Sequence, residues 1–257
     1  MSVDHATKES ILNAAKAEFA LHGFSGARLA AIAENSGVNK ALIHYYFKSK
    51  ELLYEDVWES FFTWDEEHPE NVPIYFQGDS FTILEKLYLY VYISVNLSIK
   101  FTDKKVLDIF LWELAEGGDF LKKFREKYFL DKHKIFTLIL EAGHKEGLLD
   151  LKYADMIILG ISSANFIYKI EQNRDDPKHC FLEMPHKDYK SKDEKFLNYM
   201  IEYIFRMLSP SGKPLQIPKI KQEIFEYIDK LLCMNLNKIS IPISKRIMER
   251  LCSDLVK

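Results

Sequence analysis

The chain has few residues of the kinds that cross-link a protein or anchor it in a membrane. Its three cysteines, Cys180, Cys233 and Cys252, are odd in number and widely spaced, and no C-x-x-C pair occurs. This pattern predicts neither a disulfide framework nor a structural zinc site. The sequence has no run of about 18 uncharged apolar residues, and its first residues lack the basic-then-apolar order of a signal peptide. We therefore expect a soluble cytoplasmic protein that makes no contact with a membrane.

An excess of one charge is also missing, because 35 Lys and Arg residues are nearly balanced by 38 Asp and Glu residues. A protein that coats nucleic acid along its whole surface needs many clustered cations. The net charge of −3 excludes that class but leaves room for a local basic patch. No glycine-rich phosphate loop and no G-x-S-x-G sequence is present, so we predict no cofactor and no enzyme of those classes.

Three short amphipathic helices are predicted at the N-terminal end of the chain. Apolar residues recur at helical spacing over about 7–22, and Gly23 follows them as a terminating glycine would. A second helix ends at a Ser-Gly pair, and Asn39 caps a third in which Ile43 and Phe47 point inward. Three helices joined by short turns predict a helix-turn-helix arrangement.

The rest of the chain also reads as helices, and no strand alternation competes with them. The predicted segments are about 49–67, 80–101, 103–116, 119–146, 151–172 and 192–209, with two more helices in the C-terminal region. We predict an all-α fold with a helix-turn-helix domain at 1–50, a larger helical domain at 51–210 and a helical extension at 211–257.

The third helix presents an unusual set of polar side chains on its outer face. If Ile43 and Phe47 point inward, the residues turned outward are Asn39, Lys40, Ala41, His44, Tyr45 and, at the margin, Tyr46. Such a face offers hydrogen-bond donors to phosphate oxygens and base edges, and a small alanine permits close approach to a groove. Lys48 and Lys50 stand at the start of the next helix, where an anion is favoured. The alternative is that both tyrosine rings pack into the helical core and contact nothing else.

The residues GVNKALIHYYFKSKELL, preceded by ILNAAKAEFALHGFSGARLAAIAENS, resemble the DNA-binding end of the TetR/AcrR family of transcriptional regulators. The resemblance covers about residues 7–60. It implies an all-helical protein that binds palindromic operator DNA as a homodimer through helix three. It also implies that a small ligand is sensed in the C-terminal helical domain, and repression is the commoner response in the family.

The resemblance also implies roles for individual residues. Lys40 and Ala41 would contact bases or the groove, while His44, Tyr46 and Lys50 would contact phosphates. At the start of helix two, where the family often has threonine or serine, this chain has Ala27 and Arg28, and we expect Arg28 to reach phosphate or a base instead. The full predicted DNA-binding set is Arg28, Asn39, Lys40, Ala41, His44, Tyr45, Tyr46, Lys48 and Lys50.

The aromatic residues between 80 and 172 suggest an apolar pocket between helices. The predicted lining residues are Tyr88, Tyr92, Trp112, Phe136 and Phe166, and they favour an apolar or aromatic small-molecule effector. The alternative is that these side chains are ordinary core. By the resemblance, dimerisation maps to about 151–172 and 192–209, where Gly160 and its small neighbours allow close helix approach. A contact within one chain explains the same small residues.

Two other functions remain open from the sequence. The E-x-x-H sequences at Glu141 to His144 and Glu183 to His186 have the spacing of a di-metal carboxylate enzyme built in a helical bundle. The second contains Pro185, which breaks the required helical geometry. The basic extension at 211–257 could instead enlarge the dimer interface, cover the pocket, or dock a protein partner.

Overall fold

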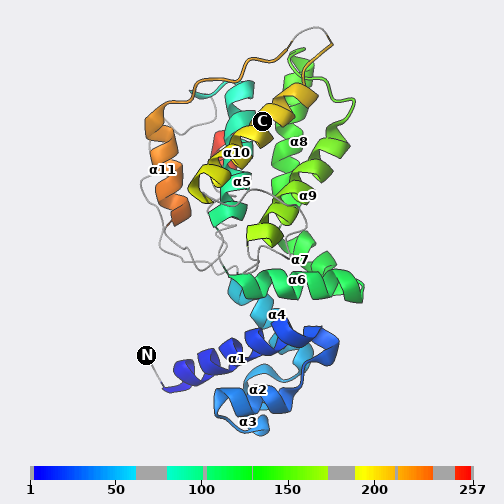
Figure 1. The fold of residues 1–257 in the computed structure, drawn as a ribbon, viewed down its shortest axis with the longest axis vertical. Coiled ribbons are helices and arrows are strands. Elements are labelled where there is room, and N and C mark those ends of the chain that lie inside the picture. Colours follow the sequence, from blue (N-terminus) through cyan, green and yellow to red (C-terminus); the bar gives the residue numbers. More distant parts are fainter. Residues whose placement is uncertain are drawn as a thin grey trace. The chain divides into compact units, whose positions relative to one another are not determined.

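The computed structural model of the protein describes residues 3–61, 80–100, 103–128, 130–172, 189–211, 214–233 and 247–255. Within these ranges the regular elements are helices and no strand occurs, which confirms the all-α prediction. Figure 1 shows them. They are α1 (Val3–Gly26), α2 (Leu29–Ser36), α3 (Lys40–Phe47), α4 (Lys50–Phe61), α5 (Ile83–Lys100), α6 (Lys104–Glu116), α7 (Asp119–Tyr128), α8 (Leu130–Lys145), α9 (Ala154–Gln172), α10 (Tyr189–Met207) and α11 (Gln222–Cys233).

The chain forms two compact units that do not follow the order of the sequence. The first unit holds α1 to α4 together with α6 and α7. The second unit holds α5, α8 to α11 and a short helical turn at 247–251. Two helices from the middle of the chain therefore belong to the same unit as the helix-turn-helix.

In the first unit the predicted helices occur with small differences at their ends. α1 begins at Val3, four residues before the predicted start, and it continues to Gly26. Gly23 interrupts it with φ 67° and ψ −178°, so the break predicted at this glycine is present. Such a backbone conformation suits glycine because a Cβ atom disfavours it. The side chain of Asn39 accepts a hydrogen bond of 2.9 Å from the Leu42 amide, which confirms the predicted cap of α3.

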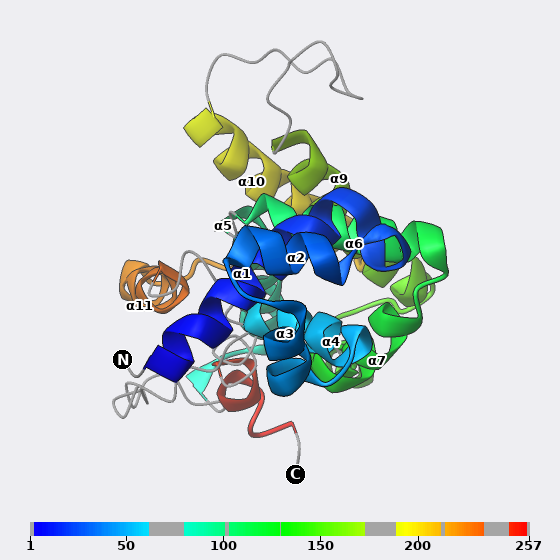
Figure 2. The same cartoon turned by 90° about the horizontal axis from the view of Figure 1, so that it is seen from below.

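α1 is the central helix of the first unit. It packs against α2 and α4, and it also packs against α6 (Figure 1). Figure 2 views the same unit from the side of α2 and α3. Ile43 and Phe47 are almost fully buried, as predicted for the inner face of α3. They join a core whose other members include Ile11, Ala15, Phe19, Ile32, Leu53, Val57 and Phe61.

The second unit is built around α5, which packs against α8, α9, α10 and α11. Buried residues occur on all sides of this helix, as expected for a helix enclosed by others. Its first turn carries a capping box in which Thr82 and Glu85 bond each other reciprocally, with the Thr82 amide 2.8 Å from a Glu85 carboxylate oxygen. The segment predicted at 119–146 consists of two helices, α7 and α8, which belong to different units.

The C-terminal extension contributes to the core of the second unit. Its buried side chains are Ile224, Ile228, Leu232, Ile247, Met248, Leu251 and Cys252. Of the helices that the structure describes, none has the length and apolar character needed to cross a bilayer.

Candidate nucleic-acid interface

The predicted DNA-recognition helix, α3, is short. One of its faces is apolar and buried, and the opposite face is exposed to solvent. Ile43 is 1% exposed and Phe47 is 3% exposed, so these two positions fix the inner face. The Asn39 cap satisfies one of the free amides at its first turn. The opposite face is left to polar and small side chains.

Most of the predicted DNA-binding residues lie on the solvent-accessible surface of the first unit. The exposed ones are Arg28, Asn39, Lys40, Ala41, His44, Tyr45 and Lys48, whereas Tyr46 and Lys50 are half-buried. Arg28 occupies the N-cap position of α2, and its backbone amide donates to the Glu18 carboxylate at 3.0 Å. In the described part of the chain, the charged side-chain groups of Arg28 and Lys40 form no hydrogen bond or ion pair.

Tyr45 and Lys48 form one local group at the end of α3. Tyr45 is 67% exposed, although large aromatic side chains are usually more buried. The Lys48 ammonium lies 5.3 Å from the centre of the Tyr45 ring and donates a hydrogen bond of 2.7 Å to the Tyr45 carbonyl oxygen. The Tyr46 ring meets the Tyr45 ring edge-on at 5.2 Å.

Tyr46 holds α3 against the first turn of α1. Its hydroxyl donates a hydrogen bond to the Asp4 carboxylate, and this bond raises the pKa of Tyr46. The two tyrosines of the sequence pair therefore differ, because Tyr45 is open to solvent while Tyr46 has a structural partner on α1. The alternative that both rings pack into the core does not describe Tyr45.

The turn between α3 and α4 has an unusual backbone. Lys48 is the only non-glycine residue with positive φ in the described ranges, at φ 64° and ψ −50°. The Ser49 amide donates to the Phe47 carbonyl oxygen at 2.7 Å across Lys48, which makes a three-residue γ-turn of the rare, strained type. The Ser49 hydroxyl then accepts from the Leu52 amide at 3.2 Å and caps α4. Strained backbone of this kind is often found at functional sites.

Lys50 lies at the first residue of α4 and reaches back to the end of α1. Its ammonium is 3.4 Å from the Ser25 carbonyl oxygen and 4.9 Å from the centre of the Phe24 ring. An ammonium group has three donors, so the Ser25 contact leaves donors that can meet an anion. Lys50 is therefore pre-positioned by contacts within the unit.

Sequence reasoning missed the contribution of α6 and α7 to this unit. The Trp112 indole donates to the Ala20 carbonyl oxygen at 3.1 Å, and Glu116 accepts from the Ser25 amide at 3.4 Å. Phe120 of α7 meets the Tyr54 ring edge-on at 4.8 Å. These contacts connect residues more than 60 positions apart in the sequence, and no local sequence pattern predicts them.

The five predicted effector-binding residues are divided between the two units. Trp112 lies in the first unit, beside a surface depression of about 260 Å³ lined by Ala20, Asp108, Leu111 and Trp112. The other four lie in the second unit. Tyr88 and Tyr92 stack on α5 with ring centres 6.5 Å apart, Phe136 stacks on Tyr90 at 4.7 Å, and Phe166 is half-buried on α9.

The metal-enzyme alternative depends on two E-x-x-H sequences, of which the structure describes only the first. His144 contacts the Leu149 carbonyl oxygen at 3.0 Å through Nδ1. Glu183 and His186 lie outside the described residues. Among the residues that are described, no group of three or more His, Cys, Asp or Glu side chains is placed to hold a metal ion.

Comparison with known proteins gives one consistent family. Residues 11–57 match the model of bacterial regulatory proteins of the tetR family. The chain is 53% identical over 49 residues to the HTH-type transcriptional regulator RutR of Escherichia coli, which covers 19% of this chain and 23% of RutR. It is 48% identical over 54 residues to an HTH-type transcriptional repressor of Streptomyces coelicolor, covering 21% of this chain and 28% of the repressor.

A solved structure extends the likeness beyond the N-terminal helices. The crystal structure of HlyIIR, described as a hemolysin II transcriptional regulator, aligns with a TM-score of 0.52 and 22% identity. The alignment covers 81% of this chain and 99% of HlyIIR. At this identity the likeness shows the fold. The sequence matches to RutR and to the repressor span only about a quarter of those proteins.

Proposed function

The chain belongs to the TetR family of bacterial regulatory proteins, and from that premise we propose that it is a ligand-responsive transcriptional regulator that binds operator DNA. It acts as a cytoplasmic homodimer and represses transcription in the absence of its effector. Reading of DNA is assigned to residues 1–50, and effector binding and dimerisation to residues 51–210.

The observation that carries this proposal is the outer face of α3. A short helix with two buried anchors presents Lys40, Ala41 and His44 to solvent. The side chain of Lys40 is free of partners in the described structure, so binding an anion breaks no existing bond. A protruding helix with cationic and amide side chains and a small residue suits the major groove.

Each residue of the face has an expected partner on DNA. Lys40 and Ala41 contact base edges, since they lie at the start of the helix, where a recognition helix meets bases. His44 and Lys50 contact phosphates and fix the orientation, and Tyr46 joins them by exchanging its hydrogen bond to Asp4 for one to a phosphate oxygen. The remaining members, Arg28, Asn39, Tyr45 and Lys48, supply further phosphate or groove contacts around them.

The homodimer is proposed to form through α9 and α10. α9 exposes Met156, Leu159 and Ile167 along one stripe, with 57%, 58% and 39% of their surfaces accessible. α10 adds Tyr199, which is 61% exposed. Exposed apolar side chains that recur on one face typically mark an interface. A Cβ atom at Gly160 would lie 3.7 Å from the Tyr203 hydroxyl of the same chain, which is an ordinary contact distance.

The effector is proposed to be apolar or aromatic and to bind in the second unit. A two-fold symmetric DNA-binding dimer must hold its two recognition helices about 34 Å apart so that they enter successive major grooves. An effector that favours a different spacing of the two α3 helices shifts the population away from the DNA-binding state. Tyr88, Tyr92, Phe136 and Phe166 remain the proposed contacts in that unit. Trp112 lies in the first unit and is left out of this proposed site.

Fluorescence anisotropy tests the proposal directly. The purified full chain is titrated against labelled duplexes from its own upstream region and against random duplexes, at two salt concentrations and with unlabelled competitor. We expect tight, competitor-resistant binding to one duplex. Weak binding that salt abolishes for every duplex, in protein freed of bound small molecules, would contradict the assignment.

A further inference from the structure

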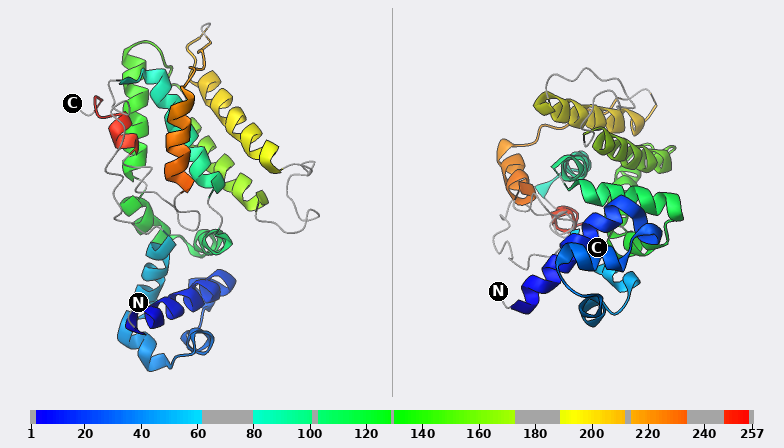
Figure 3. Two further views of the ribbon diagram at one scale, coloured as in Figure 1. Left: turned by 90° about the vertical axis from the view of Figure 1, so that its left-hand side faces the viewer. Right: turned by 60° about the horizontal axis from the view of Figure 1, so that its bottom comes forward.

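The C-terminal extension is attached to α5 at two separate places. α11 runs beside α5, as Figure 3 shows in its left-hand view, and the turn at 247–251 packs into the same core. Both places combine buried apolar side chains with one polar contact to α5. The two attachments differ in how deeply they are buried.

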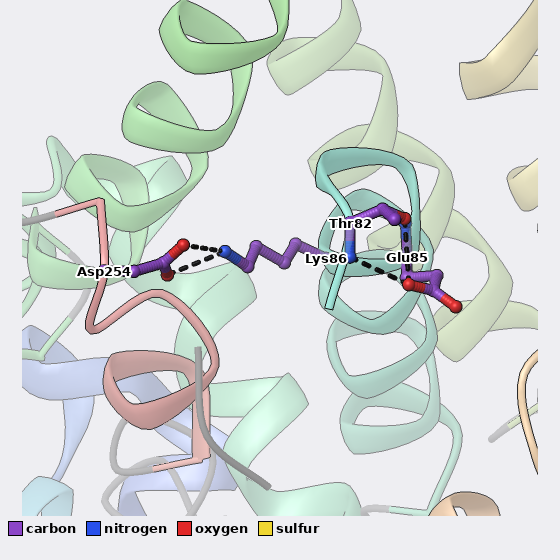
Figure 4. Close-up of polar contacts among 4 residues, drawn as sticks. All are labelled: Thr82, Glu85, Lys86 and Asp254. Carbon is purple, nitrogen blue, oxygen red and sulfur yellow. Dashed lines mark hydrogen bonds and ion pairs between the residues drawn. The ribbon is translucent and has the colours of Figure 1, made fainter. Parts of the chain in front are cut away.

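The terminal attachment is the more enclosed one. The Lys86 ammonium of α5 bonds both carboxylate oxygens of Asp254, at 2.7 and 2.6 Å (Figure 4). The Lys86 side chain is 1% exposed, whereas that of Asp254 is 34% exposed. Met248 and Leu251 beside them are fully buried. A buried ammonium needs its partner because it has lost its hydration, so this contact is costly to break.

The attachment through α11 is less buried than the terminal one where Phe225 meets α5. Phe225 contacts the rings of Tyr88 at 5.9 Å and Tyr92 at 4.8 Å, and both Phe225 and Tyr88 are only half-buried. The Tyr92 hydroxyl donates a hydrogen bond of 3.0 Å to the Asp229 carboxylate. Ile228, one turn from Phe225, is fully buried.

We propose that α11 is a built-in competitor for the effector. A planar aromatic ligand binds the Tyr88 and Tyr92 rings by displacing Phe225, while the Lys86 to Asp254 contact keeps the end of the chain attached. The proposal rests on the proposed effector function, and it assigns the extension a role in setting effector affinity.

The chemistry of the contact favours exchange of this kind. Phe225 offers the tyrosine rings an apolar ring face and edge, which a planar aromatic molecule reproduces. Solvent already reaches Phe225 and Tyr88, so a ligand can begin to insert without opening the core. The described contacts of α11 with α5 include the aromatic cluster of Phe225, the hydrogen bond from Tyr92 to Asp229 and buried apolar side chains such as Ile228.

Hydrogen exchange on the unmodified full chain is the first test. The probe is 1-anilinonaphthalene-8-sulfonate, added at increasing concentration while amide exchange is followed by mass spectrometry. We expect exchange in α11 to become faster as the probe binds, with α5 and α8 unchanged or slower. Unchanged or slower exchange in α11 at saturating probe, or no binding of the probe, would overturn the proposal.

A matched pair of variants on α11 gives the second test. Asp229→Ala removes the acceptor of the Tyr92 hydroxyl without altering α5, and we expect about fivefold tighter probe binding because one net hydrogen bond no longer opposes displacement. Glu226→Ala changes an exposed acid on the same helix and should leave the probe affinity at the wild-type value. Equal affinities of the two variants contradict the competition.

Operator binding by the same preparations separates this inference from the proposed function. Wild type and Asp229→Ala should bind the operator duplex equally well in the absence of probe. If they do and α11 does not respond to the probe, the regulator assignment stands and only the competition fails. If neither binds any duplex specifically, the proposed function fails first.

Discussion

The hydroxyl of Tyr54 on α4 donates a hydrogen bond of 2.8 Å to the carboxylate of Glu113 on α6, across 59 positions of sequence. Both side chains are buried, with Tyr54 at 0% and Glu113 at 3% exposure. The backbone amides of Phe120 and Leu121, at the start of α7, act on the same carboxylate and lower the pKa of Glu113. One carboxylate therefore links α4, α6 and α7 of the first unit.

We expect Tyr54→Phe to lower the free energy of unfolding by about 1–2 kcal/mol, because a buried carboxylate loses one of its donors. Urea denaturation followed by circular dichroism measures the change. Tyr45→Phe is the matched control, since it removes an equivalent hydroxyl from an exposed ring of the same unit. A stability loss of the same size in both variants would show that the hydrogen bond to Glu113 contributes little.

Glu113 should also make the stability depend on pH. Burial raises its pKa, since the charged form loses hydration, and the bonds from Tyr54 and the α7 amides only partly offset this. The folded state therefore holds the proton to a higher pH than the unfolded state does. It follows that this group contributes most at low pH and that its contribution falls as pH rises above the ordinary glutamate range.

Glu113→Gln removes this titration and keeps an acceptor for Tyr54. We expect the unfolding free energy of wild type minus that of the variant to decrease between about pH 4 and pH 7. Denaturation series at several pH values provide the test. A difference that stays constant over this range would mean that the Glu113 pKa is the same in both states.

The lysines of the proposed DNA-binding face should differ in what they recognise. Lys50→Ala should weaken binding to all duplexes alike and reduce the salt slope by about one, whereas Lys40→Ala should also relax sequence preference. Lys123→Ala on α7 is the control, because this lysine is 69% exposed and paired with Glu55 away from α3. Equal salt slopes for wild type and Lys50→Ala would refute the phosphate contact.

The positive φ of Lys48 predicts that glycine and alanine at this position differ in their effect on stability but not in their effect on DNA binding. Glycine adopts φ 64° with less strain than other residues. The free energy of unfolding of Lys48→Gly should therefore be about 1 kcal/mol higher than that of Lys48→Ala. Both variants lose the ammonium and should lose DNA affinity by the same factor. Denaturation and anisotropy on the pair separate the two effects, and an alanine variant as stable as the glycine variant would show that the backbone is unstrained there.

Much of this architecture follows from periodicity and caps. Asn39, Gly23 and the inward pair Ile43 and Phe47 were predictable because helix signals act within a few residues. The hydrogen bond between Tyr54 and Glu113 was not predictable, because tertiary packing determines which two side chains meet. Trp112 illustrates the same limit, because the sequence shows an aromatic residue on a helix but not the unit in which that helix packs.

The extension shows a second limit. Its two amphipathic segments were predicted from apolar spacing, and three roles were left open for them. Their place on α5 depends on pairs such as Lys86 and Asp254, which are 168 positions apart. Amphipathic spacing predicts that a face is buried but does not identify the helix that buries it.

The proposed dimer face gives the final prediction. Leu159 is 58% exposed on α9, so a charge there disturbs the folded chain little but is buried and unpaired in the dimer. Leu159→Glu should therefore convert the dimer to monomer in sedimentation velocity and lower operator affinity about a hundredfold or more, since two linked half-sites bind far better than one. Leu21→Glu places the same charge on a 69% exposed leucine of the other unit and should remain dimeric. A dimeric Leu159→Glu protein would move the interface away from this stripe of α9, whatever its affinity for DNA.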